Sequence, residues 1–284
     1  MTPQVSLVMP VWRPVGDWFR QAVESALGQT GCTVELIVID DGNETPLAPF
    51  RDERVQLLRV EHGGQSAARN AGIAGASGRY IRFIDSDDVL EPGSTARLLA
   101  LIAGLADVIA HGATVVCDEE LNPLKTTASA LEGDVREACL LGRFSVRHES
   151  LLFPRQVVER AGRWEDGFVV SADWDFTLRA LEHATVRADP APATYYRRHA
   201  QSMTGVAGIA GGEADRRRII ERYFERHPEE RGGSLERRAY AELYLDRAFA
   251  YARANRRWTA WNRLARAARR RPMTAMRALP ALLR

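Results

Sequence analysis

Two four-residue segments rich in aspartate, called the acidic quartets below, follow strand-like segments in the first third of the chain. The first, DDGN at 40–43, follows the β-branched run 34–39, and the second, DSDD at 85–88, follows the strand-like segment 80–84. Crowded carboxylates repel each other and are costly to desolvate without a cation. A hard divalent ion such as Mg²⁺ or Mn²⁺ prefers oxygen ligands and, when one or two carboxylates hold it, keeps positions free for substrate phosphates. The quartets therefore indicate chemistry on a nucleoside diphosphate.

A solvated turn that caps a helix is the alternative interpretation of residues 85–88. Short acidic side chains are common in turns and at helix N-termini, and Pro92 follows closely. An isolated acidic quartet is more often such a turn, but the neighbouring motifs reverse this preference.

The elements that carry the quartets alternate between strand and helix patterns. The expected strands and helices are, in order, strand 5–9, helix 18–27, strand 34–39, strand 55–60, helix 66–76 and strand 80–84. This alternation predicts a mostly parallel sheet with helices on its faces. In such sheets ligands bind beyond the carboxyl ends of the strands, which is where both quartets fall.

Four motifs occupy this region: VSLVMPVWR at 5–13, ELIVIDDG at 35–42, GGQSAARNAG at 63–72 and GRYIRFIDSDD at 78–88. Together they resemble the nucleotide-sugar-binding half of family 2 (GT-A fold) inverting glycosyltransferases. The segment GRWEDGF at 162–168 with ADWDFTLR at 172–179 is similar to the acceptor side of that family, and YYRRHAQS at 195–202 to its closing motif. The resemblance implies an α/β GT-A fold over residues 1–204.

The resemblance assigns the base of the donor to residues near the first two strands. Pro10 and Val11 are implied as backbone contacts to the base, with Trp12 beside them. Asp41 is implied as the acceptor for a pyrimidine ring N–H. A carboxylate suits uracil or thymine because these rings carry an imide N–H where cytosine presents an acceptor. The implied donors are therefore UDP and dTDP sugars.

The resemblance assigns the ribose, diphosphate and metal to the second quartet and its neighbours. Asp85 is implied to face the ribose together with Ser86, and Asp87 to hold Mg²⁺ or Mn²⁺. His199 is a further candidate for the metal or diphosphate, although a lone histidine is more often a packed or surface group. Arg69 is expected to contact the diphosphate or a carboxylate, and an ion pair with Asp41 or Asp88 is the equally weighted alternative.

Asp173 is the residue that the resemblance implies as the catalytic base. It stands just ahead of a helix-like run at 174–181, so a helix cap is the alternative interpretation. A carboxylate can remove the proton of an attacking hydroxyl, while a cation stabilises charge on the leaving phosphates. Asp175 is expected to be structural. Where the family has Glu-Asp this chain has Ala172-Asp173, which leaves the base in place.

Other nucleotide-binding classes lack their motifs in this chain. A dinucleotide-binding oxidoreductase needs G-x-G-x-x-G after the first strand, where this chain has MPVW at 9–12. A phosphate loop of the G-x-x-x-x-G-K-[ST] type is excluded because Lys125 is the only lysine. The remaining alternative is a catalytically degenerate protein that binds nucleotide as a scaffold, and intact Asp85, Asp87 and Asp173 argue against it.

Composition is typical of a folded, soluble protein. Of 284 residues, 45% are hydrophobic and 27% charged, and no apolar run approaches the ~18 residues of a membrane-spanning helix. Three distant cysteines exclude a disulfide scaffold and a cysteine-based zinc site. The N-terminus lacks the pattern of a secretory signal. These observations predict a cytoplasmic protein.

Charge divides the chain at a glycine-rich segment. Residues 1–212 hold 20 basic and 28 acidic residues, whereas residues 213–284 hold 19 basic and nine acidic ones. We therefore expect a glycine-rich linker at 205–212, which leads to a basic helical extension at 213–284. The helices expected there are 213–226, 235–254 and 257–270, with a turn at Asn255.

The last part of the extension, 247–284, has eleven arginines and no acidic residue, interleaved with aromatic and aliphatic side chains. This pattern favours contact with an anionic membrane surface, which predicts a peripheral position at the inner face of the plasma membrane. The alternative is that Trp258, Trp261 and Leu264 form the buried face of a packed helix. Nucleic acid is not an expected partner. The expected acceptor is a saccharide or lipid-linked hydroxyl, and residues 98–160 contain no readable motif that would identify it.

Overall fold

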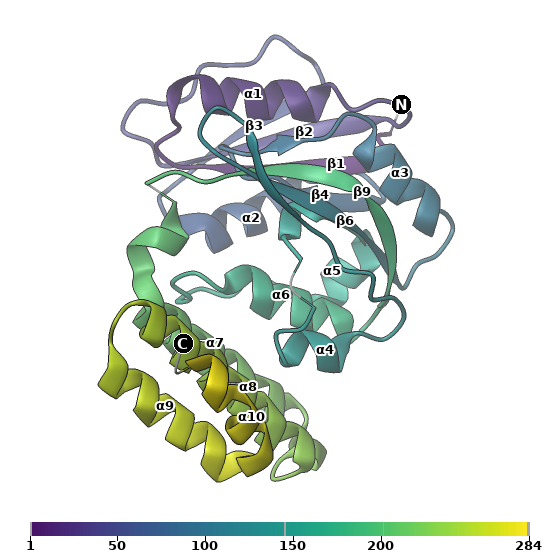
Figure 1. Ribbon diagram of the computed structural model, residues 1–284. Helices are drawn as coiled ribbons and strands as arrows, with labels where there is room; N and C mark the ends of the chain where they lie inside the picture. The colour runs from purple at the N-terminus through teal and green to yellow at the C-terminus, as the bar shows by residue number, and fades with distance from the viewer. Residues whose placement is uncertain (1, 145, 201, 283–284) are drawn as a thin grey trace. The chain divides into compact units, whose positions relative to one another are not determined.

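The computed structural model describes residues 2–144, 146–200 and 202–282, which form two compact units (Figure 1). Unit 1 contains the described residues of 1–135, 145–167 and 172–200. Unit 2 contains those of 136–144, 168–171 and 201–284. Two short segments from within the first 204 residues thus group with unit 2, and the expected domain boundary at 204 stays a prediction.

Unit 1 is built on a sheet that has nine strands within the described residues. In chain order they are β1 (Val5–Val11), β2 (Val34–Asp41), β3 (Val55–Val60), β4 (Tyr80–Phe83), β5 (Val89–Leu90), β6 (Val108–Cys117), β7 (Pro123–Thr127), β8 (Leu151–Pro154) and β9 (Thr185–Arg197). Their spatial order is β3-β2-β1-β4-β8-β6-β9-β5, and β7 pairs with β6. The strands β3, β2, β1 and β4 are mutually parallel, as the sequence predicts. Strand β8 is antiparallel to both β4 and β6.

Helices cover both faces of the parallel strands. On one face, Leu7 and Met9 of β1 share a buried apolar core with α1 (Gly16–Leu27) and α3 (Ser94–Ile102). Helix α2 (Gly64–Gly75) lies on the other face. All seven residues of β1 are buried, which is typical of a parallel strand that is covered on both sides.

The second half of unit 1 adds short elements around β8. A 3₁₀ turn, η1 (His148–Ser150), leads directly into β8, which is followed by α5 (Arg155–Ala161). Helix α6 (Ala172–Leu181) packs against α5. Its Phe176 stacks on Trp164 with ring centroids 4.4 Å apart, so that the helix start is anchored by a buried aromatic pair.

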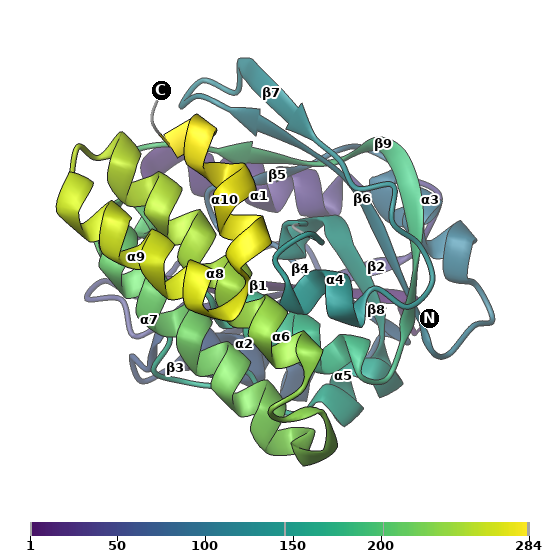
Figure 2. The ribbon, with the colours of Figure 1, turned by 60° about the horizontal axis from the view of Figure 1, so that its bottom comes forward.

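Unit 2 is helical (Figure 2). It contains α4 (Arg136–Leu140), α7 (Met203–Arg226), η2 (Pro228–Glu230), α8 (Ser234–Arg253), α9 (Arg257–Arg270) and α10 (Pro272–Leu282). Helices α8 and α9 form the expected hairpin, and Asn255 has the positive φ of 56° that turns the chain between them. The carboxylate of Asp215 in α7 accepts the backbone N–H groups of Val169, Val170 and Ser171, which explains why that segment groups with unit 2.

The glycine-rich segment that was expected as a linker, 205–212, lies inside α7. The helical backbone is interrupted at Gly208, where φ is 64° and ψ is −176°. A residue without a Cβ adopts this conformation readily, so helix can form on both sides of the break. Among the described residues, no helix combines the length and apolar character needed to cross a bilayer.

Candidate active site

Both acidic quartets reach the same edge of the sheet. Strand β1 runs parallel to β2 with Val11 opposite Asp40, and parallel to β4 with Val8 opposite Phe83. The carboxyl ends of these strands therefore lie together, and the quartets that follow β2 and β4 meet there.

Asp40 is a structural residue of the first quartet. It is buried, and its carboxylate accepts hydrogen bonds from Asn43 and the Leu47 backbone and pairs with Arg59 at 2.8 Å. Burial works to raise the pKa of Asp40, but these donors outweigh it and lower the pKa. Asn43 also donates to the Val11 carbonyl at 3.0 Å, which ties the ends of β1 and β2 together.

Asp41 organises the loop that leads into α2. Its two carboxylate oxygens accept the backbone N–H groups of Gly63 and Gly64 at 2.9 and 3.1 Å, and His62 Nδ1 lies 2.9 Å from Oδ2. Oδ1 has one of these partners and keeps a second lone pair, whereas Oδ2 has two partners, so contact with a pyrimidine N–H stays a prediction. The Trp12 ring stacks on His62 with centroids 3.8 Å apart, which places the predicted base-contacting residue beside Asp41.

Arg69 forms an ion pair with Asp85. Its Nη2 lies 2.7 Å from Asp85 Oδ1, and its guanidinium is over the Trp164 ring at 4.5 Å. The alternative partners Asp41 and Asp88 are both wrong, because Asp41 accepts the N–H groups of Gly63 and Gly64 and Asp88 accepts that of Arg197. Arg69 is only 2% exposed, so removal of Asp85 would leave a buried cation without a compensating carboxylate.

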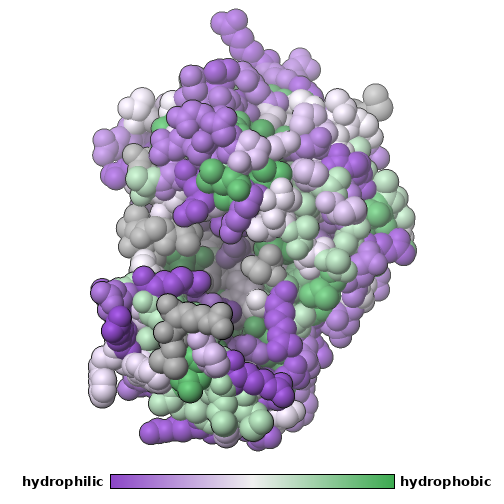
Figure 3. All heavy atoms as spheres, in the orientation of Figure 1, coloured by the Kyte–Doolittle hydropathy of each residue, from purple (hydrophilic) through white to green (hydrophobic). Residues whose placement is uncertain are grey.

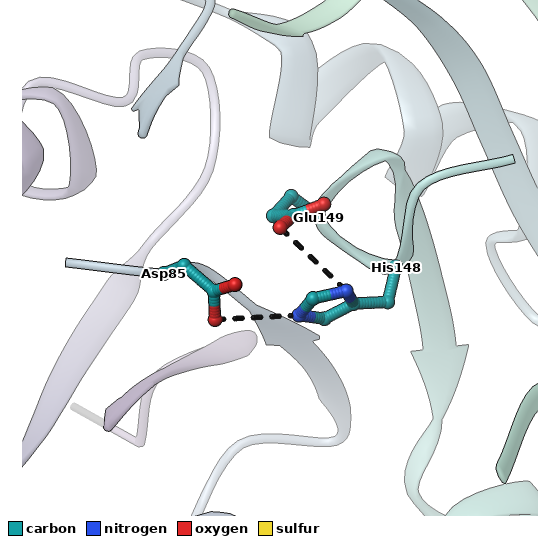
Figure 4. A group of neighbouring side chains, drawn as sticks. All are labelled: Asp85, His148 and Glu149. Atoms are coloured by element: carbon teal, nitrogen blue, oxygen red, sulfur yellow. Dashed lines mark ion pairs between the residues drawn. The ribbon is translucent and has the colours of Figure 1, made fainter. Parts of the chain in front are cut away.

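His148 and Glu149 are site residues that the sequence reasoning missed (Figure 4). His148 Nε2 lies 3.5 Å from Asp85 Oδ1, and its Nδ1 lies 3.6 Å from Glu149 Oε1 and 3.9 Å from Asp173 Oδ2. Burial alone would lower the pKa of His148, but the carboxylates of Glu149 and Asp85 outweigh it and raise the pKa. Both residues come from the region without a readable motif, where an isolated His-Glu pair carries no signal.

The charges around Asp85 determine its ionisation. Burial would raise the pKa of Asp85, but Arg69 and His148 outweigh this effect and hold the pKa well below its ordinary value. Asp85 is therefore a carboxylate held by Arg69 and His148 at the junction of β4 and the second quartet, and Arg69 Nη2 also lies 3.0 Å from His148 Nε2. Ser86, the other residue expected at the ribose, follows it in the same turn.

Asp87 and His199 are brought together, as expected for a shared role. His199 Nε2 lies 2.8 Å from Asp87 Oδ2, and the imidazole packs near Trp18 with ring centroids 4.8 Å apart. Burial and the charge of Asp85 raise the pKa of Asp87. A carboxylate with a raised pKa beside another carboxylate gains from a cation.

Asp88 faces the protein instead of the solvent. It is 1% exposed, and its Oδ1 accepts the Arg197 backbone N–H at 2.8 Å. The Arg197 guanidinium donates to the Asp87 carbonyl, the Glu119 carbonyl and Gln21 Oε1. Arg197 thus anchors the end of β9 to the second quartet.

Asp173 lies in the first turn of α6 and is 31% exposed. Its Oδ1 accepts the N–H of Trp174 at 2.8 Å, which is the next residue and not the N2 or N3 position that a standard helix cap serves. Its Oδ2 faces His148. Asp175 is buried and pairs with Arg179 at 2.8 Å, so it is structural as expected.

The motif on α2 joins the donor side to the acceptor-side segment. Asn70 exchanges two hydrogen bonds with the backbone of Trp164, at 2.8 and 2.9 Å, and Ser66 donates to the Glu165 carbonyl at 2.9 Å. With Arg69 on Asp85, one helix face therefore connects the second quartet to the segment 162–168.

The second quartet fits a hard divalent cation. Oxygen atoms of Asp85, Asp87 and Asp88 all lie within 4.8 Å of one another, and the Oδ2 atom of Asp88 is buried and has no hydrogen-bond partner among the described residues. Carboxylate oxygens are the ligands that Mg²⁺ or Mn²⁺ prefers, so a cation beside Asp87 would also offset the negative charge of its two acidic neighbours.

A family model described as Glycosyl transferase family 2 matches residues 6–156, more than half of the chain. The chain belongs to glycosyl transferase family 2. An uncharacterized glycosyltransferase of Rickettsia prowazekii is 25% identical over 219 residues, which cover 72% of this chain and 67% of the relative. The succinoglycan biosynthesis protein ExoO of Rhizobium meliloti is 40% identical over 102 residues, 34% of this chain and 29% of ExoO.

Solved structures show the same fold. The structure of residues 1–349 of TarS from S. aureus is similar with a TM-score of 0.59 at 14% identity, over 96% of this chain and 82% of that one. The expected GT-A fold is confirmed, and so is the expected class of enzyme, a family 2 glycosyltransferase. The roles of individual residues of this family 2 enzyme stay predictions.

Proposed function

We propose that this family 2 glycosyltransferase moves a sugar from a UDP or dTDP donor to a hydroxyl acceptor with inversion at the anomeric carbon. One observation supports the proposal above the others. The imidazole of His148 lies between Asp85 and Asp173, 3.5 Å from the first and 3.9 Å from the second. The donor-side carboxylate and the predicted base therefore flank one ring.

Asp173 is the general base of this proposal. Its carboxylate is partly exposed, whereas Asp85 and Glu149 nearby are more buried. An exposed carboxylate can reach an acceptor hydroxyl and remove its proton as the hydroxyl attacks. A single in-line displacement by that hydroxyl inverts the anomeric configuration. His148 contacts both carboxylates through its two ring nitrogens.

The donor is held by the chain's own polar groups. Asp87 and His199 are the residues that would bind Mg²⁺ or Mn²⁺, which when bound supplies Lewis-acid stabilisation of the departing diphosphate, and Asp85 would face the ribose. Arg69 keeps Asp85 ionised and oriented. Trp12 and Asp41 stand where the base is expected.

The proposed acceptor is a polysaccharide or glycolipid under assembly. The similarity to a succinoglycan biosynthesis protein supports a saccharide acceptor. The proposed location is the cytoplasm at the inner face of the plasma membrane, where the basic segment 247–284 would meet anionic lipids.

The exposed side chains of unit 2 support this membrane contact. Trp258 is 84% exposed, Met273 64% and Met276 66%. Figure 3 shows hydrophilic and hydrophobic side chains interspersed over the helices of unit 2. The alternative that Trp258, Trp261 and Leu264 form one buried face is wrong, because Leu264 is buried with Ala260 and Ala267 whereas both tryptophans lie on the outer side of α9.

Donor hydrolysis and transfer assays with UDP and dTDP sugars test the proposal. We expect Asp173→Asn to lower kcat by about 10² or more while UDP affinity changes only a few-fold, since loss of a general base affects the chemical step. Calorimetry with UDP provides the affinity.

Asp175→Asn is unsuitable as a control because it breaks the buried pair with Arg179, so Asp166→Asn in the preceding segment serves instead. Near-normal turnover of Asp173→Asn would return Asp173 to a structural role, and UDP binding without any turnover of wild type would favour the scaffold alternative.

A further inference from the structure

An open pocket of about 350 Å³ lies within unit 2, where the start of α8 meets the junction of α9 and α10. Four arginines line it: Arg237 and Arg238 from α8, and Arg270 and Arg271 from the end of α9. These helices can be followed side by side in Figure 2. None of the residues that line this pocket belongs to the candidate active site.

The positive charge of the pocket is largely uncompensated. Arg238 pairs with Glu137 at 2.6 Å, but among the described residues Arg237, Arg270 and Arg271 have no ion pair with a carboxylate. The nearest acidic side chain on the first turn of α8, Glu236, accepts the Gly232 N–H. Like charges held close together repel, so the arrangement gains free energy when an anion enters.

The arginines are held in place without being neutralised. The guanidinium of Arg270 lies over the Tyr240 ring at 4.8 Å and over the Tyr244 ring at 5.3 Å. Arg237 donates to the Gly232 carbonyl at 2.8 Å, which uses one of its five N–H groups. Guanidinium groups positioned in this way keep free donors for a ligand.

We infer that this pocket binds the phosphate group of a phosphate ester. Planar guanidinium forks match phosphate oxygens in bidentate geometry, and several of them converge here. Ser234 and Thr274 add hydroxyl donors, and the N-terminus of the 20-residue helix α8 contributes favourable partial charge. The volume is at the lower end of the ~300–1,000 Å³ of small-molecule sites and exceeds what bare phosphate needs.

The surroundings favour the headgroup of a phospholipid as the source of that phosphate. Pro272 and Met273 line the pocket beside the arginines, and Met273 and Met276 expose most of their side chains. An anionic pocket ligand next to exposed apolar side chains suits a lipid, which has its phosphate adjacent to hydrocarbon. This choice of source rests on the membrane contact proposed above, whereas phosphate binding itself does not.

Two double variants of the full chain with equal net charge test the inference. Arg237→Gln with Arg271→Gln removes two pocket arginines. Arg269→Gln with Arg277→Gln removes two exposed arginines that do not line the pocket. Calorimetry with glycerol 3-phosphate measures binding of the soluble ester. Flotation with vesicles of phosphatidylcholine and phosphatidylglycerol measures binding of the lipid, and thermal unfolding confirms that both variants are folded.

We expect the pocket variant to bind glycerol 3-phosphate and vesicles at least about tenfold more weakly than the matched control, because charge-assisted hydrogen bonds are lost. Replacing the same two residues by lysine should restore part of the binding. If the pocket variant loses binding of glycerol 3-phosphate but binds vesicles normally, the pocket binds a soluble phosphate ester, and the inference that its ligand is a phospholipid is wrong. If both glutamine variants weaken binding equally, or if wild type binds neither ligand, the inference that this pocket binds phosphate is wrong. UDP binding in the same samples reports separately on the proposed function.

Discussion

Asp87 and Asp88 are adjacent carboxylates with different surroundings. Asp87 is 35% exposed beside His199, whereas Asp88 is buried and accepts a backbone N–H from Arg197. In Asp88→Asn the amide oxygen can still accept the Arg197 N–H. Asp87→Asn, in contrast, removes a charged oxygen that is predicted to bind the metal ion. The two positions therefore provide a matched pair for testing metal dependence.

We expect Asp87→Asn to weaken Mn²⁺-dependent UDP binding by about tenfold or more, the scale expected for loss of a charged group, and Asp88→Asn to change it much less. Calorimetry with UDP in Mn²⁺ and in EDTA measures both. His199→Ala should change the response to Mn²⁺ in the same direction as Asp87→Asn. Equal wild-type affinity in EDTA and Mn²⁺ would show that Asp87 is not a metal ligand.

Asp85 and Arg69 form the ion pair at the centre of the site. Asp85→Asn leaves the cation of Arg69 buried without a carboxylate, and we expect the free energy of unfolding to fall by about 3 kcal/mol or more near neutral pH. The pKa of Asp85 is lowered in the folded protein, so its stabilising contribution is complete above its ordinary pKa of about 4 and is lost as pH falls further.

Urea unfolding of wild type and Asp85→Asn therefore has a defined pH dependence. The difference in unfolding free energy between the two proteins should be largest near pH 7 and shrink below about pH 4. Asp52→Asn, which breaks an exposed pair with Arg54, is the control and should have little effect. A difference that stays constant over this range would mean that Asp85 is not ionised through its pair with Arg69.

At the scale of elements, α2 positions the site because it lies unusually close to the sheet. A Cβ added at Gly72 would come within 2.5 Å of Val8 Cγ1 and 2.7 Å of Ile39 Cδ1, both in buried strands. Only a glycine allows this approach. The closeness lets Arg69 and Asn70, on the same helix, reach Asp85 and Trp164.

We expect Gly72→Ala to destabilise the protein by about 1–3 kcal/mol, the usual cost of forcing extra volume into a packed core. Gly75→Ala in the same helix is the control, because its Cβ would meet the side chain of Leu58 at 3.1 Å, a contact that a flexible side chain can relieve. Urea unfolding of both variants measures the difference. A Gly72→Ala protein as stable as Gly75→Ala would show that α2 can move away from the sheet without cost.

At the scale of the whole molecule, charge and apolar exposure are concentrated in the C-terminal part of the chain. Residues 213–284 have an excess of ten basic groups, and the exposed Met273 and Met276 lie on α10. Electrostatic attraction to anionic lipids and insertion of apolar side chains add to each other at a bilayer surface.

We expect the double variant Met273→Ser with Met276→Ser to float several-fold less with anionic vesicles than wild type does. Leu124→Ser is the control, since Leu124 is 57% exposed but lies on β7 of unit 1. Binding of wild type should also fall at high salt because ions screen exposed charges. Equal flotation of the methionine variant and the control would exclude α10 from membrane contact.

The amino-acid sequence by itself determined the parallel half of the sheet. Strand 55–60 matches β3, and helix 257–270 matches α9, because local patterns of apolar residues and turn formers are sufficient for such elements. The same reasoning placed Asp41 and Asp87 at strand ends. The enzyme class could be predicted because each family motif consists of residues that are contiguous in the sequence.

Only the tertiary structure decided which side chains surround the predicted base. His148 reaches Asp85 because β8, which follows it, inserts antiparallel between β4 and β6, with Phe153 opposite Ile81. Pairing between strands some seventy residues apart leaves no local pattern in the sequence. The partner of Arg69 likewise depends on which carboxylate the fold brings to α2. Which side of α9 is exposed depends on which side the neighbouring helices cover. Local residue patterns determine elements, and long-range packing determines the charges that meet at a site.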